Sequence, residues 1–207
     1  MGSLIFIPAG TVAYWQAWAY LVIFFGSSLL ITLYLMRKDP ALLRRRVAAG
    51  PTKETTLPQR IVMYLASLAF IALLVVPALG HRFDWLPLPA YVELAGDVFV
   101  AVCFYVQFLV FKENTFASAT VEIARDQRVI ATGPYAFIRH PMYAGALLLF
   151  IGTPLALGSY CGLVAFFVVL PVLIWRLLDE EKLLANELPG YTDYCARVRW
   201  RLIRGIF

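Results

Sequence analysis

The chain has 207 residues, of which 61% are hydrophobic and only 15% are charged. Its mean hydropathy of +0.75 excludes an ordinary soluble domain and predicts a single polytopic membrane domain over residues 1–207. The net charge of +5 does not indicate a nucleic-acid partner, because the basic residues gather beside apolar segments, as on the cytoplasmic face of a membrane protein.

An all-α fold with five membrane-spanning helices is expected. The apolar run that ends near residue 178 is too long for one crossing, so it is divided at residues 157–160 into two helices joined by a tight hairpin. We therefore predict spans at about residues 12–36, 61–79, 91–111, 142–157 and 160–178.

The third predicted span carries the polar residues Glu93, Asp97 and Gln107. Ionisable groups at membrane depth usually face a protein interior or a cavity. Glu93 and Asp97 lie near one end of the span, so they either cap the helix in the headgroup region or point into the protein.

The connecting segments differ sharply in charge. Lys and Arg are frequent in residues 37–60, in 112–141 and from 176 onward, whereas 80–90 holds one and 157–160 holds none. Under the positive-inside rule, this alternation places the N-terminus outside and the loop 112–141 and the tail 179–207 in the cytoplasm. Residues 37–60 are compatible with a short interfacial helix. Within the second loop, Val121-Glu122-Ile123 and Val129-Ile130 favour a short hairpin or an extended flap.

Residues 132–143 read Thr-Gly-Pro-Tyr-Ala-Phe-Ile-Arg-His-Pro-Met-Tyr and immediately precede an apolar run. A residue before proline avoids the helical region, so His140 should be extended and Pro141 should begin the next helix. The imidazole, the Arg139 guanidinium and free backbone N–H groups would then meet at a helix N-terminus. Such a place suits an anion.

A second polar set lies where the fifth span leaves the membrane, at Arg176, Asp179, Glu180 and Glu181. The tight hairpin would make the last two spans antiparallel neighbours, which brings this set towards His140. Arg176 and Glu180 are four residues apart and share one helix face. Asp179 and Glu181 are expected to be solvated helix charges.

Four motifs follow one another in the order Gly133-Pro134-Tyr135, Arg139-His140-Pro141-Met142-Tyr143-Ala144-Gly145, Glu180-Glu181-x-x-Leu184 and Tyr191-x-x-Tyr194. With them the chain resembles the isoprenylcysteine carboxyl methyltransferase family, which is related to the phospholipid N-methyltransferases, and it looks like a compact, prokaryotic-type member. The resemblance implies an integral membrane enzyme that takes S-adenosylmethionine from the cytoplasm and a prenylated or lipid acceptor from the bilayer. The cofactor pocket would be cytoplasmic, formed by loops and the C-terminal helix.

The resemblance also implies roles for single residues. Arg176 would hold the acceptor carboxylate and Glu180 the cofactor's ammonium group, and these two would be the catalytic residues. A sulfonium beside Tyr135 or Tyr143 would gain cation–π stabilisation. The implied cofactor-binding residues are Gln127, Arg128, Val129, Ile130, Tyr135, Arg139, His140, Pro141, Met142, Tyr143 and Glu180.

Plainer interpretations stay open for these residues. Arg139 would equally suit a lipid phosphate, and the two tyrosines would suit an interfacial aromatic belt. The three cysteines are single and far apart, so no metal site is expected.

The expected reaction is carboxyl O-methylation of a prenylcysteine-like acceptor. The alternatives are N-methylation of a phospholipid amine, a sterol-type membrane reductase with a nicotinamide cofactor, and a non-catalytic membrane scaffold.

Overall fold

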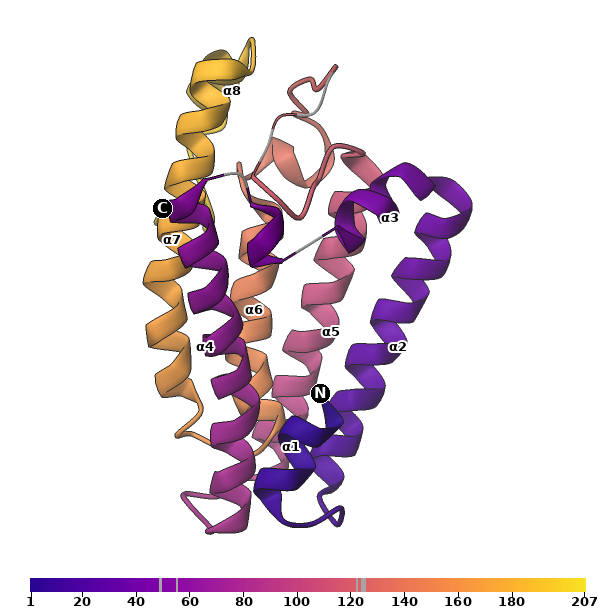
Figure 1. Ribbon diagram of the computed structural model, residues 1–207, viewed down its shortest axis with the longest axis vertical. Coiled ribbons are helices and arrows are strands. Elements are labelled where there is room, and N and C mark those ends of the chain that lie inside the picture. Colours follow the sequence, from indigo (N-terminus) through magenta and orange to yellow (C-terminus); the bar gives the residue numbers. More distant parts are fainter. Residues whose placement is uncertain (49, 55, 122, 124–125) are drawn as a thin grey trace. The chain divides into compact units, whose positions relative to one another are not determined.

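A computed structural model describes residues 1–48, 50–54, 56–121, 123 and 126–207. These residues form helices and no named strand; an isolated bridge joins Pro87 and Ser159. This confirms the all-α prediction. The elements, labelled in Figure 1 where there is room, are α1 (Gly2–Ala9), α2 (Trp15–Lys38), α3 (Pro40–Val47), η1 (Pro51–Lys53), α4 (Leu57–Arg82), α5 (Ala90–Glu113), η2 (Gly133–Ala136), α6 (Pro141–Ala156), α7 (Leu163–Glu187) and α8 (Tyr191–Arg197).

Three helices, α2, α4 and α5, are long and apolar enough to cross a membrane. They correspond to the first three predicted spans and support a membrane protein. Within the described residues, α6 and α7 do not reach that standard. Helix α6 has only 16 residues, and the apolar run that opens α7 is interrupted at Arg176. The five-span arrangement therefore stays a prediction.

The described part of the chain divides into two compact units. The first consists of Met1–Leu30, Leu65–Phe104 and Ala146–Val172, and the second of Ile31–Tyr64, Tyr105–Gly145 and Leu173–Phe207. Each unit is described by itself.

In the first unit, helices pack closely around a core that includes Tyr14, Tyr20, Leu74, Val100 and Leu157. The Tyr14 hydroxyl donates to the carbonyl of Leu157 at 2.5 Å.

Helices α5 and α6 approach each other in the first unit through glycine. A Cβ added at Gly96 would lie 2.3 Å from the backbone nitrogen of Ala156. Glu93 and Asp97, on the same helix as Gly96, are each 4% exposed, and Glu93 accepts a hydrogen bond from Gln16 at 3.0 Å. Of the two alternatives for this acidic pair, the structure favours the one in which it points into the protein.

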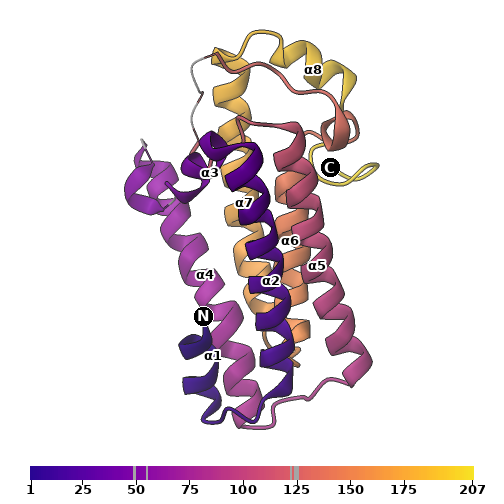
Figure 2. The same cartoon turned by 90° about the vertical axis from the view of Figure 1, so that its right-hand side faces the viewer.

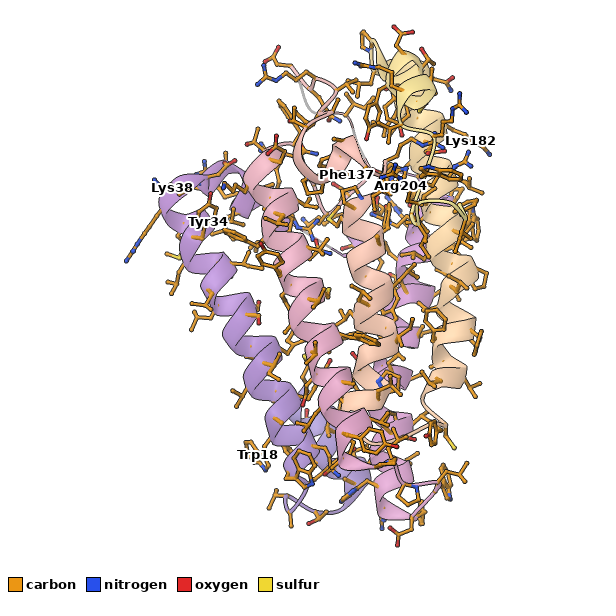
Figure 3. All side chains as sticks on the ribbon, turned by 180° about the vertical axis from the view of Figure 1, so that it is seen from behind. Trp18, Tyr34, Lys38, Phe137, Lys182 and Arg204 are labelled. Carbon is orange, nitrogen blue, oxygen red and sulfur yellow. The ribbon has the colours of Figure 1, made fainter. Side chains whose placement is uncertain are left out.

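In the second unit, the C-terminal end of α2 has one side that packs against α5 and another that faces away from the protein. Tyr34 points towards α5 (Figure 3), where its ring meets that of Phe108 with centroids 5.0 Å apart. Lys38 extends away from the protein in the same view. A cation at the end of an apolar helix suits the headgroup region. The short helix expected within residues 37–60 is present as α3, whose Asp39 cap accepts from the backbone N–H of Leu42.

A second apolar cluster in this unit consists of Leu188, Tyr191 and Tyr194, with Val129 packed against it. It joins α8 to the polar loop after α5, and Figure 2 shows the loop running alongside α8. The described residues between 121 and 130 form no strand. Glu122, which belonged to the expected hairpin, lies outside the described residues.

Candidate functional site

The stretch before α6 folds as its sequence predicts, with one important difference. Pro141 is the first residue of α6, so the predicted helix start is confirmed. The backbone N–H of Arg139 donates to the carbonyl of Trp200 at 2.8 Å, and that of His140 donates to the carbonyl of Arg201 at 2.9 Å. Of the backbone N–H groups around the helix start, the C-terminal tail therefore occupies the two that directly precede Pro141.

Glu181 is the centre of a buried ionic network. It is 9% exposed, forms an ion pair with Arg139 at 3.0 Å, and accepts hydrogen bonds from His140 Nε2 at 3.1 Å and from Arg201 Nε at 2.8 Å. The expectation of a solvated charge is wrong, because the tail brings Arg201 over the helix. Burial acts to raise the pKa of Glu181, but the hydrogen bonds from His140 and Arg201 and the charge of Arg139 outweigh it and hold the pKa below its ordinary value.

Glu180 faces the start of α6 instead. The Tyr143 hydroxyl donates to Glu180 Oε2 at 2.5 Å, and the rings of Tyr143 and His140 are 5.5 Å apart. His140 therefore contacts one of two consecutive glutamates, and Tyr143 contacts the other. This arrangement brings the predicted residues of α6 and α7 together within the second unit.

Tyr135 adds a third aromatic ring from the loop. Its hydroxyl accepts from Asn114 at 2.9 Å, and its carbonyl accepts from the Tyr194 hydroxyl at 2.8 Å. Burial and the nearby charge of Glu180 raise the pKa of Tyr135 to about 12, although the Asn114 hydrogen bond lowers it. The phenol therefore stays neutral at physiological pH.

Arg176 already forms an ion pair and hydrogen bonds with other residues of the chain. It forms an ion pair with Glu54 at 2.9 Å and also donates to Gln59 and to the carbonyl of Ala119, both at 2.9 Å. Glu54 is only 1% exposed, and Gln59 in turn donates to Asp179 at 2.5 Å. Arg176, which was expected to bind the acceptor carboxylate, is thus paired with the carboxylate of Glu54 from the same chain.

The segment implied for backbone contacts, residues 127–130, runs beside α8 (Figure 2). Arg128 is exposed, whereas Gln127, Val129 and Ile130 are half-buried. Val129 packs against Tyr191 and its neighbours, so part of this segment has a packing role.

Sequence reasoning missed Arg46, on α3. Its Nη1 donates to the carbonyl of Ser118 at 2.8 Å and contacts Met142 Sδ at 3.6 Å. Its guanidinium carbon lies 5.0 Å from the centroid of the Phe111 ring. Gln107 approaches the same methionine and donates to the Met142 carbonyl at 3.0 Å.

Sequence patterns gave little sign of Arg46 or Glu54. Both lie in a loop rich in Lys and Arg, where one further cation or a lone acid looks like ordinary interfacial charge. The one available signal was that Glu54 is among the few acids in residues 37–60.

The arrangement suits a ligand that carries positive charge. A half-buried carboxylate, Glu180, lies beside the ring of Tyr143, and its charge acts on the pKa of Tyr135. Carboxylates and aromatic faces are the groups that bind ammonium and sulfonium cations.

Residues 92–188 match the family model described as phospholipid methyltransferase, the family of isoprenylcysteine carboxyl methyltransferase-like proteins. The matched segment contains the start of α6 and the polar end of α7, but not residues 31–64, which supply Arg46 and Glu54. A comparison with curated proteins found no match.

Proposed function

We propose that this chain, whose residues 92–188 match the phospholipid methyltransferase family model, transfers a methyl group from S-adenosylmethionine to a lipophilic acceptor. One observation carries the proposal. Tyr143 at the start of α6 and Glu180 at the polar end of α7 are in direct contact at 2.5 Å, which supports a single cation-binding site built from both helices.

The residues present fit the cofactor's charged groups. Glu180 would bind the ammonium, and Tyr135 and Tyr143 would offer ring faces to the sulfonium. His140 would bind the carboxylate, while its contact with Glu181 fixes the orientation of the ring. Arg139, Pro141, Met142 and residues 127–130 would line the rest of the pocket.

The cofactor supplies an electrophilic methyl group on a positively charged sulfur. A carboxylate acceptor would receive this methyl group in exchange for the sulfur leaving group without losing a proton. An amine acceptor would also have to lose a proton. The side chains of this site would therefore act mainly by aligning the two reactants and excluding water.

The proposed acceptor is the carboxylate of a prenylcysteine-like molecule, and a phospholipid amine is the second candidate. The membrane arrangement proposed with it has five crossings, with α6 and the apolar part of α7 as the last two. The N-terminus would lie outside, and residues 112–141 and 179–207 would face the cytoplasm. The distribution of Lys and Arg supports this orientation.

Methyl transfer from labelled S-adenosylmethionine tests the function. The full chain in nanodiscs is offered N-acetyl-S-farnesylcysteine or phosphatidylethanolamine, and the labelled product is treated with base. A base-labile methyl ester on the farnesyl compound supports carboxyl methylation, and a base-stable methylamine supports the second acceptor. Label in neither product, together with a thermal shift by NADPH and none by S-adenosylhomocysteine, would refute a methyltransferase and point to a reductase.

A further inference from the structure

Two arginines of the second unit differ in how completely they are paired. Arg176 has a carboxylate partner in Glu54. Among the described residues, no carboxylate lies within ion-pairing distance of Arg46. Within the described part of the chain, Arg46 contacts one carbonyl oxygen, one thioether sulfur and one aromatic ring.

The contacts of Arg46 leave one edge of its guanidinium open. Both hydrogen-bonding contacts use Nη1, and no described residue accepts from Nε or Nη2. The Nε–Nη2 edge presents two parallel N–H groups with the spacing of a carboxylate or phosphate, which bind such an edge through two hydrogen bonds.

The surroundings of Arg46 disfavour an unpaired cation. Burial lowers the pKa of Arg46, and the neighbouring charge of Arg176 lowers it further, against the opposite effect of the nearby phenols. Arg46 is half-buried, and a partly desolvated charge without a partner is unfavourable, so this position suits an anion supplied by a bound ligand.

The same surroundings indicate which molecule carries that anion. Arg46 adjoins Phe111 and Met142, and both belong to the apolar cluster formed with Leu35, Leu42 and Val110. Apolar side chains around an open guanidinium edge suit the head of a lipophilic molecule better than the polar amino-acid end of the cofactor.

We propose that Arg46 binds the anionic group of the methyl acceptor, a carboxylate or a phosphate, through its open guanidinium edge. This assignment rests on the proposed function. It assigns the anion-binding role expected of Arg176 to Arg46, which lies outside the segment that matches the family model. Arg176 and Glu54 then act as a fixed ion pair next to the acceptor.

Binding of N-acetyl-S-farnesylcysteine and of its methyl ester to the full chain in nanodiscs tests this assignment without turnover. The two probes differ only in the anion. We expect wild type to bind the acid at least about tenfold more tightly than the ester, as for a charge-assisted hydrogen bond. Arg46→Gln should bind both alike, and Arg46→Lys should keep part of the preference. Arg44→Gln, which removes an exposed charge from the same helix, should behave as wild type.

Kinetics with each acceptor complete the test. Arg46→Gln should raise the KM of the acceptor about tenfold or more, with S-adenosylhomocysteine affinity unchanged. A rise in KM confined to the farnesyl acceptor identifies a carboxylate as the anion that Arg46 binds. A rise in KM confined to phosphatidylethanolamine identifies a phosphate.

Equal preference for acid over ester in wild type and Arg46→Gln would overturn the proposal. Loss of S-adenosylhomocysteine binding in Arg46→Gln would overturn it as well, because the anion would then be the cofactor's. If wild type distinguishes acid from ester through Arg46 yet methylates neither acceptor, the methyltransferase function fails and the anion site stands.

Discussion

Replacing Glu181 by alanine should detach the C-terminal tail from the start of α6. Glu181 joins Arg139 and His140, whose side chains are 9% and 5% exposed, to Arg201 of the tail. Removing one partner of a buried ion pair costs roughly 3 to 5 kcal/mol. Arg201 is 33% exposed and should contribute little of this.

The assay is hydrogen exchange at the two amides that the tail covers. The N–H groups of Arg139 and His140 donate to tail carbonyls, so their protection reports whether the tail is docked. A loss of about 3 kcal/mol corresponds to roughly a hundredfold faster exchange. Glu181→Gln keeps one acceptor oxygen and should lose only about 1 to 3 kcal/mol.

Glu187→Ala is the matched control, since Glu187 is an exposed residue of the same helix. It should leave both amides within about 0.5 kcal/mol of wild type. If Glu181→Ala and Glu187→Ala gave the same protection, Glu181 would not hold the tail.

Three further predictions follow from other contacts. The pKa of Glu181 is held below its ordinary value of 4.5. The stabilisation by the Glu181 carboxylate is therefore fully present above pH 4.5 and is lost as the pH falls through the lowered pKa. The difference in Tm between wild type and Glu181→Gln should shrink only in that acidic range. Gly96→Ala should lower stability by about 1 to 3 kcal/mol because the added methyl group meets the α6 backbone. Gly26→Ala should not, because no described residue beyond its own stretch of helix lies within 4 Å of the added Cβ; equal melting temperatures of the two variants would contradict this. Arg176→Gln should destabilise the protein by leaving Glu54 buried and unpaired, and adding Glu54→Gln should restore much of the loss; a double variant as unstable as Arg176→Gln would count against this pairing.

Much of the helical frame was predictable because long apolar runs with few charges are a strong signal. The apolar segments that form α2, α4 and α5 have the length of a membrane crossing. The N-terminal helix α1 was missed, because residues 2–9 are apolar on all sides and too short for such a signal. Its end is fixed locally by Gly10, whose φ of 68° is left-handed.

The site was predictable only at the start of α6 and across the hairpin that joins α6 to α7. Pro141 marked the start of α6, and the hairpin argument brought Tyr143 towards Glu180. The partners that come from distant segments, Glu54 for Arg176 and Arg201 for Glu181, leave no periodic or spacing pattern. The family resemblance set Glu180 apart from Glu181, but nothing in the sequence indicated that Glu181 is buried among three cationic partners.

Isothermal titration of S-adenosylhomocysteine into the full chain in nanodiscs tests the central claim most directly, because it asks whether Tyr143 and Glu180 form part of a cofactor site. The account predicts saturable binding by wild type and at least about tenfold weaker binding by Glu180→Gln, as expected when a charge-assisted hydrogen bond is lost. Absence of binding by the wild-type chain, or unchanged affinity in Glu180→Gln, would contradict it.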